Sequence, residues 1–150
     1  MLDKFLATDD GWAGLILRLT LGIVMFPHGA QKLFGWFGGY GFSGTMGFLT
    51  GQMHIPTPLA FLVIVVESVG SMALIAGAFT RLAALGIGAN MVGAILLVHD
   101  KVGFFMNWTG QQKGEGFEYH LLVIGIVLAL LLLGGGRLSA DRAFTARSRA

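Results

Sequence analysis

The sequence contains no cysteine among its 150 residues, and charged residues make up only 12% of it. The lack of cysteine excludes disulfide bonds, thiolate metal ligands and thiol redox chemistry. The shortage of charge argues against an ordinary soluble domain, because soluble chains carry about 25% charged residues and small domains have a large surface to cover for their volume. We therefore expect one integral membrane domain that extends over residues 1–150.

Four apolar segments contain most of the hydrophobic residues. A helix that crosses the hydrocarbon core needs roughly 20 apolar residues, with a range of about 17–25, and each segment is long enough. The backbone in lipid must satisfy its own hydrogen bonds, which favours helices over strands. The sequence therefore predicts an all-α, transmembrane four-helix bundle. Its predicted spans are residues 12–34, 58–80, 82–98 and 117–133.

The connections between these spans also have sequence signals. Thr57 is expected to cap the second span, with Pro58 in its first turn. Only Arg81 separates the second span from the third, so the two are expected to pack as an antiparallel hairpin. Two loops, residues 35–57 and 99–116, are rich in glycine and aromatic residues. Aromatic rings are enriched where lipid meets water, and we expect that position for Trp36, Phe37, Tyr40, Phe42 and Trp108.

The distribution of lysine and arginine predicts the orientation, because cytoplasmic segments carry an excess of both. With both termini in the cytoplasm, the chain has an N-in, C-in topology and a basic tail at residues 137–150. The cytoplasmic side then carries Lys4, Arg81, Arg137, Arg142, Arg147 and Arg149, and the outer side carries Lys101 and Lys113, with Lys32 near its boundary. A basic tail beside a membrane meets anionic lipid, so the net charge of +2 does not indicate a nucleic-acid partner.

The stretch GYGFSG, residues 39–44, matches the G-x-G-x-x-G pattern of dinucleotide-binding loops. Such a loop follows a strand and opens a soluble helix. Here the glycines follow a predicted membrane helix and face the outer side, away from cytoplasmic nucleotides. We therefore expect no nucleotide site.

Three polar residues are predicted to form a buried network within the spans: Arg18, Glu67 and Asn90. A charge at the bilayer centre is unfavourable by about 2.5–3.5 kcal/mol on insertion scales, so such residues normally face the bundle interior and have a partner. The rise along a helix places Arg18 and Glu67 at similar depths. We expect them to pair, directly or through water. A structural salt bridge and a proton relay both fit this pairing.

A second polar cluster is predicted around a cavity on the outer side, where the ends of three spans meet. Its members are His28, Lys32, His99, Glu118 and His120. Three histidines with a carboxylate are ligand types that metal ions and haem use. No pair of them has a spacing diagnostic of a metal site, however. We therefore expect neither a metal site nor haem b, and we interpret each histidine as a hydrogen-bonded residue near the membrane boundary.

The stretches RLTLGIVMFPHGAQKLFG, VVESVGSMALIAGAFTRLAAL and GEGFEYHLL together resemble the DoxX family, over about residues 17–137. The resemblance implies a small four-helix protein of the bacterial or archaeal cytoplasmic (inner) membrane. It also implies that Arg18, His28, Lys32, Glu67 and Glu118 occupy the recurring polar positions of that family. The family takes its name from a membrane subunit linked to terminal oxidase or thiosulfate:quinone chemistry, and many members are called oxidoreductases without a demonstrated reaction.

Three functions follow as hypotheses, and whether the chain is itself an enzyme stays open among them. The first is a membrane subunit of a quinone-linked oxidoreductase, in which His28, Lys32 and Glu118 carry protons and a partner supplies electrons. The second is a non-catalytic scaffold or assembly subunit of a larger membrane complex. The third is a small transporter or proton pathway gated by Arg18 and Glu67. The expected partners are the lipid bilayer and a membrane or periplasmic protein or a second copy, and quinone is the one cofactor considered.

Overall fold

The computed structural model describes residues 6–147, and the regular structure of this part is all helical, with no strand. The prediction of an all-α fold is confirmed. Lys4 and Arg149, which contributed to the predicted orientation, lie outside the described residues. In chain order the elements are α2 (Trp12–Phe34), the 3-10 turn η1 (Trp36–Gly38), α3 (Gly41–Gly47), the π-helical turn η2 (Phe48–Gln52), α4 (Thr57–Val65), the π-helical turn η3 (Val66–Gly70), α5 (Ser71–Ala76), α6 (Thr80–Ala94), the π-helical turn η4 (Ile95–His99), α7 (Glu118–Leu133) and α8 (Ala140–Arg147).

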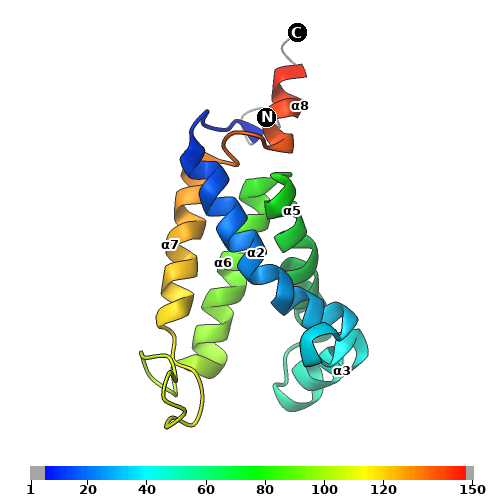
Figure 1. The fold of residues 1–150 in the computed structure, drawn as a ribbon. Coiled ribbons are helices and arrows are strands. Elements are labelled where there is room, and N and C mark those ends of the chain that lie inside the picture. Colours follow the sequence, from blue (N-terminus) through cyan, green and yellow to red (C-terminus); the bar gives the residue numbers. More distant parts are fainter. Residues whose placement is uncertain (1–5, 148–150) are drawn as a thin grey trace.

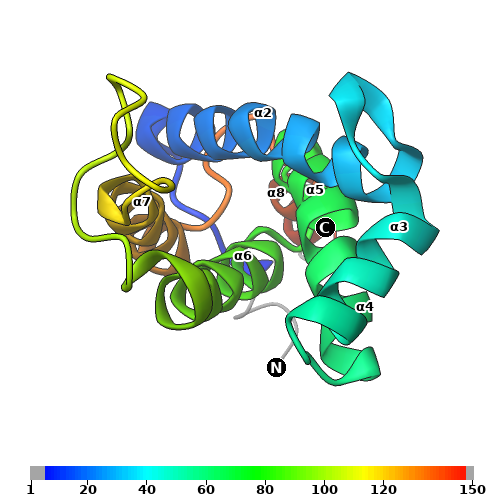
Figure 2. The same cartoon turned by 90° about the horizontal axis from the view of Figure 1, so that it is seen from below.

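Four helical rods form a ring (Figures 1 and 2). α2 packs against the continuous rod α4–η3–α5, that rod packs against α6, α6 packs against α7, and α7 packs against α2. Both termini and α8 lie at one end of the ring, which we call the terminal end. α3 and the loop between η4 and α7 lie at the other, which we call the loop end (Figure 1).

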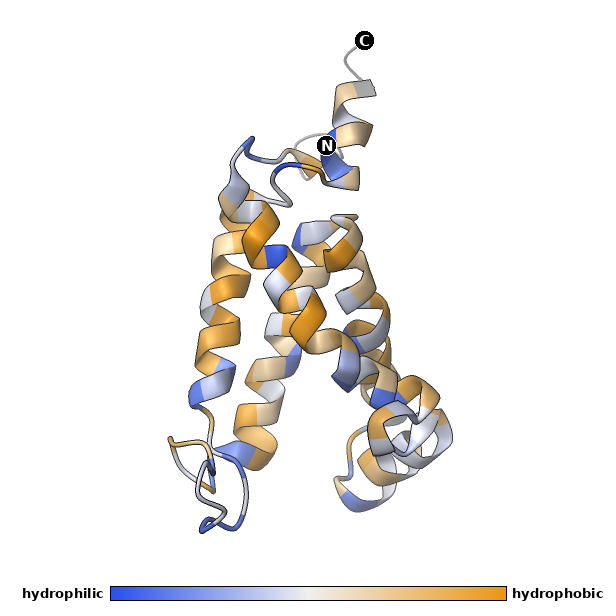
Figure 3. Cartoon of the chain, in the orientation of Figure 1, coloured by the Kyte–Doolittle hydropathy of each residue, from blue (hydrophilic) through white to orange (hydrophobic). Residues whose placement is uncertain are grey.

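Three of the rods are long and apolar enough to cross a membrane. They are Trp12–Phe34, Thr57–Ala76 and Thr80–His99, with 23, 20 and 20 residues. α7 is apolar but has only 16 residues. At a rise of about 1.5 Å per residue it is about 24 Å long, which is less than the hydrocarbon thickness of about 30 Å. Apolar residues cover most of each rod (Figure 3), as expected of a surface in contact with lipid.

The turn between the second and third rods differs from the prediction. The second rod ends at Ala76 and α6 begins at Thr80, so residues 77–79 make the turn and Arg81 lies within α6. Gly77 and Phe79 have positive φ angles of 67° and 48°, which reverse the chain within a few residues. The antiparallel hairpin itself is confirmed (Figure 1).

The start of the second rod also differs from the prediction in one detail. Thr57 is the first residue of α4 rather than its cap, and no side chain caps this end of the helix. Pro56 precedes it, and Pro58 occupies the first turn as predicted. Proline is well suited to that place because its missing N–H has no partner there in any case.

The segment at residues 35–57, predicted as a loop, instead contains η1, α3 and η2. Its many glycines concealed these short helices, because each glycine lowers helix stability by about 1 kcal/mol relative to alanine. The aromatic side chains predicted at the lipid–water boundary are all exposed at this end of the bundle: Trp36, Phe37, Tyr40, Phe42 and Trp108.

The segment predicted as a basic tail folds back onto the bundle through α8. The Asp141 carboxylate accepts hydrogen bonds from the main-chain N–H groups of Phe79 and Thr80, at 2.6 and 2.9 Å. It therefore caps the first turn of α6, where main-chain donors lack helical partners.

The apolar core connects α2, α5, α6 and α7 through Leu21, Met25, Leu74, Ala84, Ile87, Met91, Val123, Val127 and Leu130.

Candidate functional site

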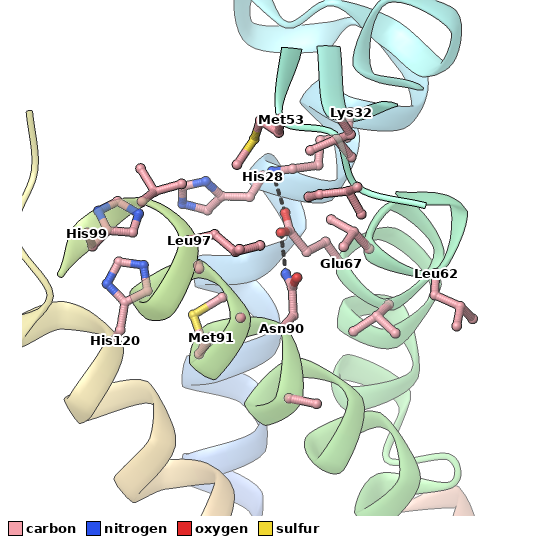
Figure 4. Close-up of a pocket in the computed structure, with 18 of the residues that line it drawn as sticks. His28, Lys32, Met53, Leu62, Glu67, Asn90, Met91, Leu97, His99 and His120 are labelled. Atoms are coloured by element: carbon pink, nitrogen blue, oxygen red, sulfur yellow. Dashed lines mark hydrogen bonds and ion pairs between the residues drawn. The ribbon is translucent and has the colours of Figure 1, made fainter. Parts of the chain in front are cut away.

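A cavity of about 740 Å³ lies in the half of the bundle toward the loop end (Figure 4). Side chains from all four rods line it, and so do residues of the three π-helical turns η2, η3 and η4. A π-helical turn interrupts the regular helical ladder and is frequent at functional sites. The wall is mostly apolar, with a few polar side chains that point inward, which is typical of a small-molecule site.

Glu67 is the most deeply buried charged group of this cavity, with 6% of its side chain exposed. Lys32 Nζ donates to its Oε2 at 2.6 Å, and Asn90 Nδ2 donates to its Oε1 at 2.6 Å (Figure 4). The Lys32 side chain is 27% exposed, so the ion pair reaches from the interior toward the opening. Both carboxylate oxygens are bound, which stabilises a negative charge in a poorly hydrated place.

Gly29 determines where Glu67 meets α2. A methyl group at Gly29 would overlap the main chain of Glu67 and Ser68, so the two rods touch here through their backbones. Lys32 follows Gly29 by three residues and lies about one helical turn closer to the loop end, on the same face of α2. The close approach therefore brings its ammonium group to the Glu67 carboxylate.

The predicted pairing of Arg18 with Glu67 is wrong. Gly29 is level with Glu67, and Arg18 precedes Gly29 by 11 residues, so Arg18 lies roughly 16 Å further toward the terminal end at about 1.5 Å per residue, level with the end of α5. The place where the two rods touch, which sets these relative depths, could not be read from the sequence. Arg18 is buried, with 2% of the residue exposed, and its guanidinium donates five hydrogen bonds to main-chain oxygens. The acceptors are the carbonyls of Leu74, Ile75, Gly135, Arg137 and Leu138.

The remaining members of the predicted network and the outer cluster form one site rather than two. Glu67 and Asn90 line the same cavity as His28, Lys32, His99 and His120. The prediction separated them because it paired Glu67 with Arg18 and grouped Asn90 with that pair. In the fold, Glu67 and Asn90 line the cavity toward the loop end.

Glu118 is not among the residues that line the cavity, contrary to the prediction. Its Oε1 accepts hydrogen bonds from the main-chain N–H of Met106, at 2.9 Å, and from Trp108 Nε1, at 3.2 Å. Glu118 opens α7, and its side chain turns back toward the preceding loop. Glu118 therefore helps to hold that loop in its folded conformation and does not line the cavity.

Two histidines lie together on one side of the cavity (Figure 4). The ring centroids of His99 and His120 are 4.1 Å apart. His99 Nδ1 is 2.8 Å from the carbonyl oxygen of Glu115, and because a carbonyl only accepts, Nδ1 must carry the hydrogen. His120 Nδ1 is buried and has no hydrogen-bond partner among the described residues.

Two kinds of lining residue were not predicted from the sequence. Tyr119 lines the cavity, and its hydroxyl group donates to the Met25 sulfur at 3.7 Å. Four methionines also form part of the wall: Met25, Met53, Met91 and Met106. Methionine is flexible and polarizable, so these side chains can adapt to the shape of a ligand. The interruption of helices by π-helical turns had no recognisable sequence signal.

The polar groups of the site provide hydrogen-bond donors and acceptors around the cavity. Among residues 6–147, no group of three or more histidines and carboxylates is placed to hold a metal ion. The Lys32–Glu67 pair and the three histidines are instead distributed around an apolar space (Figure 4). A ligand in this space would meet hydrogen-bond donors and acceptors on more than one side of the cavity.

Comparison with known proteins agrees with the sequence resemblance. The DoxX family model matches residues 13–100. The chain is also similar to the Bacillus subtilis (strain 168) protein named "Putative oxidoreductase CatD", with 31% identity over 116 residues that make up 77% of this chain and 76% of that protein. No solved structure matches the chain.

Proposed function

The chain belongs to the DoxX family of multi-pass membrane proteins, and from that premise we propose that it is a membrane subunit of a quinone-linked oxidoreductase. We place it in a bacterial or archaeal cytoplasmic (inner) membrane, with both termini in the cytoplasm and the loop end outside. The name of the Bacillus subtilis relative supports an oxidoreductase role.

The cavity beside the Lys32–Glu67 pair carries the proposal. It combines an apolar wall with a few hydrogen-bonding groups, and its volume of about 740 Å³ is large enough for an aromatic ring with part of an attached chain. Exposed apolar side chains of α4 and η4, among them Leu62 and Leu97, border it on the side that faces lipid. A membrane-dissolved quinone could therefore reach it without crossing water.

Reduction of a quinone to a quinol takes up two electrons and two protons. In this proposal a partner protein with a redox centre supplies the electrons, because the chain has no cysteine to do so. Protons reach the quinone oxygens through Glu67, Lys32 and His28, which connect the cavity interior with its opening. Glu118, considered for this role from the sequence, binds the loop instead.

Quinone binding tests the proposal directly. The purified protein is placed in lipid nanodiscs, decylubiquinone is added, and binding is measured by its quenching of tyrosine and tryptophan fluorescence. We expect saturable binding, and a lipid extract of the purified protein is expected to contain the host quinone. Deletion of the gene is expected to lower quinone-dependent respiration of isolated membranes.

Substitution of the ion pair gives the matched control. Glu67→Gln removes the charge of the buried carboxylate and is expected to lower quinone-dependent respiration at least about tenfold, as is typical when a positioned proton-transfer group is lost. Asp100→Asn makes the same chemical change at an exposed residue outside the cavity and is expected to have no effect. If the protein binds no quinone and its deletion leaves respiration unchanged, the proposal fails in favour of a scaffold role.

A further inference from the structure

His120 is a buried polar side chain without a partner at the wall of the cavity. It is 7% exposed, and no described residue bonds its Nδ1. A buried polar atom that loses its hydrogen bond costs about 1–3 kcal/mol, and such an atom in a native protein calls for an explanation. Nδ1 itself is enclosed in this ring orientation, but His120 lines the cavity, so a rotation of the ring can turn this nitrogen toward a molecule inside the cavity that supplies the missing partner.

His99 extends this binding surface. Its Nδ1–H donates to the carbonyl of Glu115, so in the neutral ring Nε2 carries no hydrogen and is an acceptor. His120 has no such constraint at Nδ1 and can take whichever tautomer a ligand needs. The two rings lie 4.1 Å apart and together offer a donor and an acceptor. A hydroxyl or carbonyl group matches this pair.

The charges around the cavity disfavour the binding of a ligand that has an ionic head group. Within the cavity the Lys32 ammonium group is already neutralised by Glu67 at 2.6 Å, and both oxygens of Glu67 are occupied. The carboxylate of Glu115 adds a negative charge at the exposed rim. An anionic head would lack a free positive partner, and a cationic head would lack a free buried carboxylate. Burying a charge without a partner is strongly unfavourable.

Apolar lining residues that are also exposed mark a route by which the apolar part of a ligand can leave the cavity. Leu59 and Leu62 of α4, and Leu97 and Val98 of η4, line the cavity and are also exposed on the outside of the bundle. These two segments belong to neighbouring rods (Figure 2). Because the lining residues exposed there are apolar, we expect the cavity to open between them toward the acyl chains rather than toward water.

We infer that His99 and His120 bind the hydroxyl or carbonyl head of an uncharged lipid, whose apolar chain leaves the cavity between α4 and η4. The inference deepens the proposed function, because it concerns the same cavity and rests on that cavity being a ligand site. It goes further in naming the residues that recognise the head, the charge that is accepted and the route that the chain takes.

Three photoreactive probes test the inference. Each has a hexadecyl chain with a diazirine group, and the heads are an alcohol, a sulfate and a trimethylammonium group. They are incorporated at trace amounts into phosphatidylcholine nanodiscs that contain the full-length protein, and labelled peptides are identified by mass spectrometry. We expect the alcohol to label α4 and η4 at least about tenfold more than either charged probe. Equal labelling by a charged probe, or alcohol labelling confined to other segments, would overturn the inference.

Substitutions of His120 identify the head-group contact. His120→Phe keeps a ring but removes both nitrogens, and it is expected to lower alcohol labelling roughly tenfold through the lost hydrogen bond. His120→Gln keeps a donor and an acceptor and is expected to retain most labelling. His54→Phe makes the same change at an exposed histidine outside the cavity and should leave labelling unchanged. Unchanged labelling of His120→Phe contradicts the inference.

The outcome can be separated from that of the proposed function. Gel filtration and thermal unfolding show whether His120→Phe is folded. If it is not, labelling of His99→Phe and the comparison of the three probes test the head-group assignment instead. If the alcohol labels the site as expected but decylubiquinone neither binds nor is reduced, the quinone function fails while the lipid site stands. If decylubiquinone binds with the same affinity to His120→Phe, the quinone site stands and the head-group assignment fails.

Discussion

At the terminal end of the bundle, the guanidinium of Arg18 donates to five main-chain carbonyls in a closely packed interior. At the loop end, the ammonium of Lys32 binds the carboxylate of Glu67 beside a cavity. Both are cation sites on one helix, α2, but Arg18 is buried, Lys32 is partly exposed, and their partners differ. Main-chain acceptors hold Arg18 in place and join α2 to α5 and to the segment that precedes α8. At the loop end, the partner of Lys32 is a side chain at the wall of the cavity.

This difference teaches that a charged residue in a membrane span is not evidence of function by itself. Arg18 does not line the cavity described above, and its hydrogen bonds account for its burial. The surroundings of Glu67 combine a charge with empty space and with histidines. The comparison predicts that the terminal end contributes mainly stability and the loop end mainly activity.

The largest effect on stability is expected from Arg18→Met. The change removes all five hydrogen bonds of the guanidinium, of which those to Leu74 and Gly135 are buried. A buried carbonyl left without a donor costs about 1–3 kcal/mol, although Leu74 keeps the N–H of Gly77 as a donor, at 3.1 Å. We expect the free energy of unfolding to fall by about 3–5 kcal/mol, measured by thermal unfolding in detergent. Arg142→Met, which removes an exposed partner of Asp10, is the control and should have little effect. A stable Arg18→Met protein would contradict the structural role.

The next largest effect is expected from Gly29→Ala at the contact between α2 and η3. The added methyl overlaps the main chain of Glu67 and Ser68, so the rods must separate. Overpacking of this kind costs about 1–3 kcal/mol, and quinone binding should fall with it because Glu67 moves. Gly125→Ala adds the same methyl in open space on α7 and should be neutral or slightly stabilising. Equal unfolding temperatures for the two variants would show that the contact is not tight.

A smaller loss of stability is expected from Asp141→Ala at the terminal end. The substitution removes the acceptor for the N–H groups of Phe79 and Thr80 at the start of α6. Loss of such a cap typically costs about 1 kcal/mol, which thermal unfolding in detergent can resolve. Asp141→Asn keeps one acceptor and is expected to lose less. A larger loss for asparagine than for alanine would argue against capping.

Replacing the whole ion pair at the loop end is expected to change stability less than any of these. The double variant Lys32→Met with Glu67→Gln leaves no unpaired charge, and replacement of a buried pair by neutral groups is often close to neutral, within about 1 kcal/mol. Quinone-dependent respiration should nevertheless be lost. If quinone-dependent respiration survives in a stably folded double variant, the loop end is not the part of the bundle that contributes the activity.

The smallest effect concerns Asp10, which is exposed at the terminal end. The hydrogen bond from Arg142, together with the positive charges of Arg142 and Arg137, holds the pKa of Asp10 below its ordinary value of 3.8. The pair therefore contributes its full stabilisation above the unfolded pKa, and this contribution is lost as the pH falls through the lower folded pKa. A carboxyl NMR titration should give a midpoint below 3.8, and Arg142→Gln should raise it. An unchanged midpoint in that variant would contradict the assignment.

Particular residues show how far the sequence could predict the site. The scarcity of charge identified His28, Lys32, Glu67, Asn90 and His120 as candidates, and the fold brings all five to one cavity. Their pairing was not predictable, because it depends on where α2 crosses the second rod. Glu118 was misplaced for the same reason, since its partners come from the folded loop before α7.

The sequence alone determined that the chain is helical, that its helices are apolar and that it resembles the DoxX family. These properties depend on composition and on runs of neighbouring residues, which are local. Only the tertiary structure decided that Lys32, and not Arg18, is the partner of Glu67, and that π-helical turns surround a cavity. The reason is that a backbone contact at a single glycine sets the register of two helices, and the residues that it brings together lie far apart in the chain.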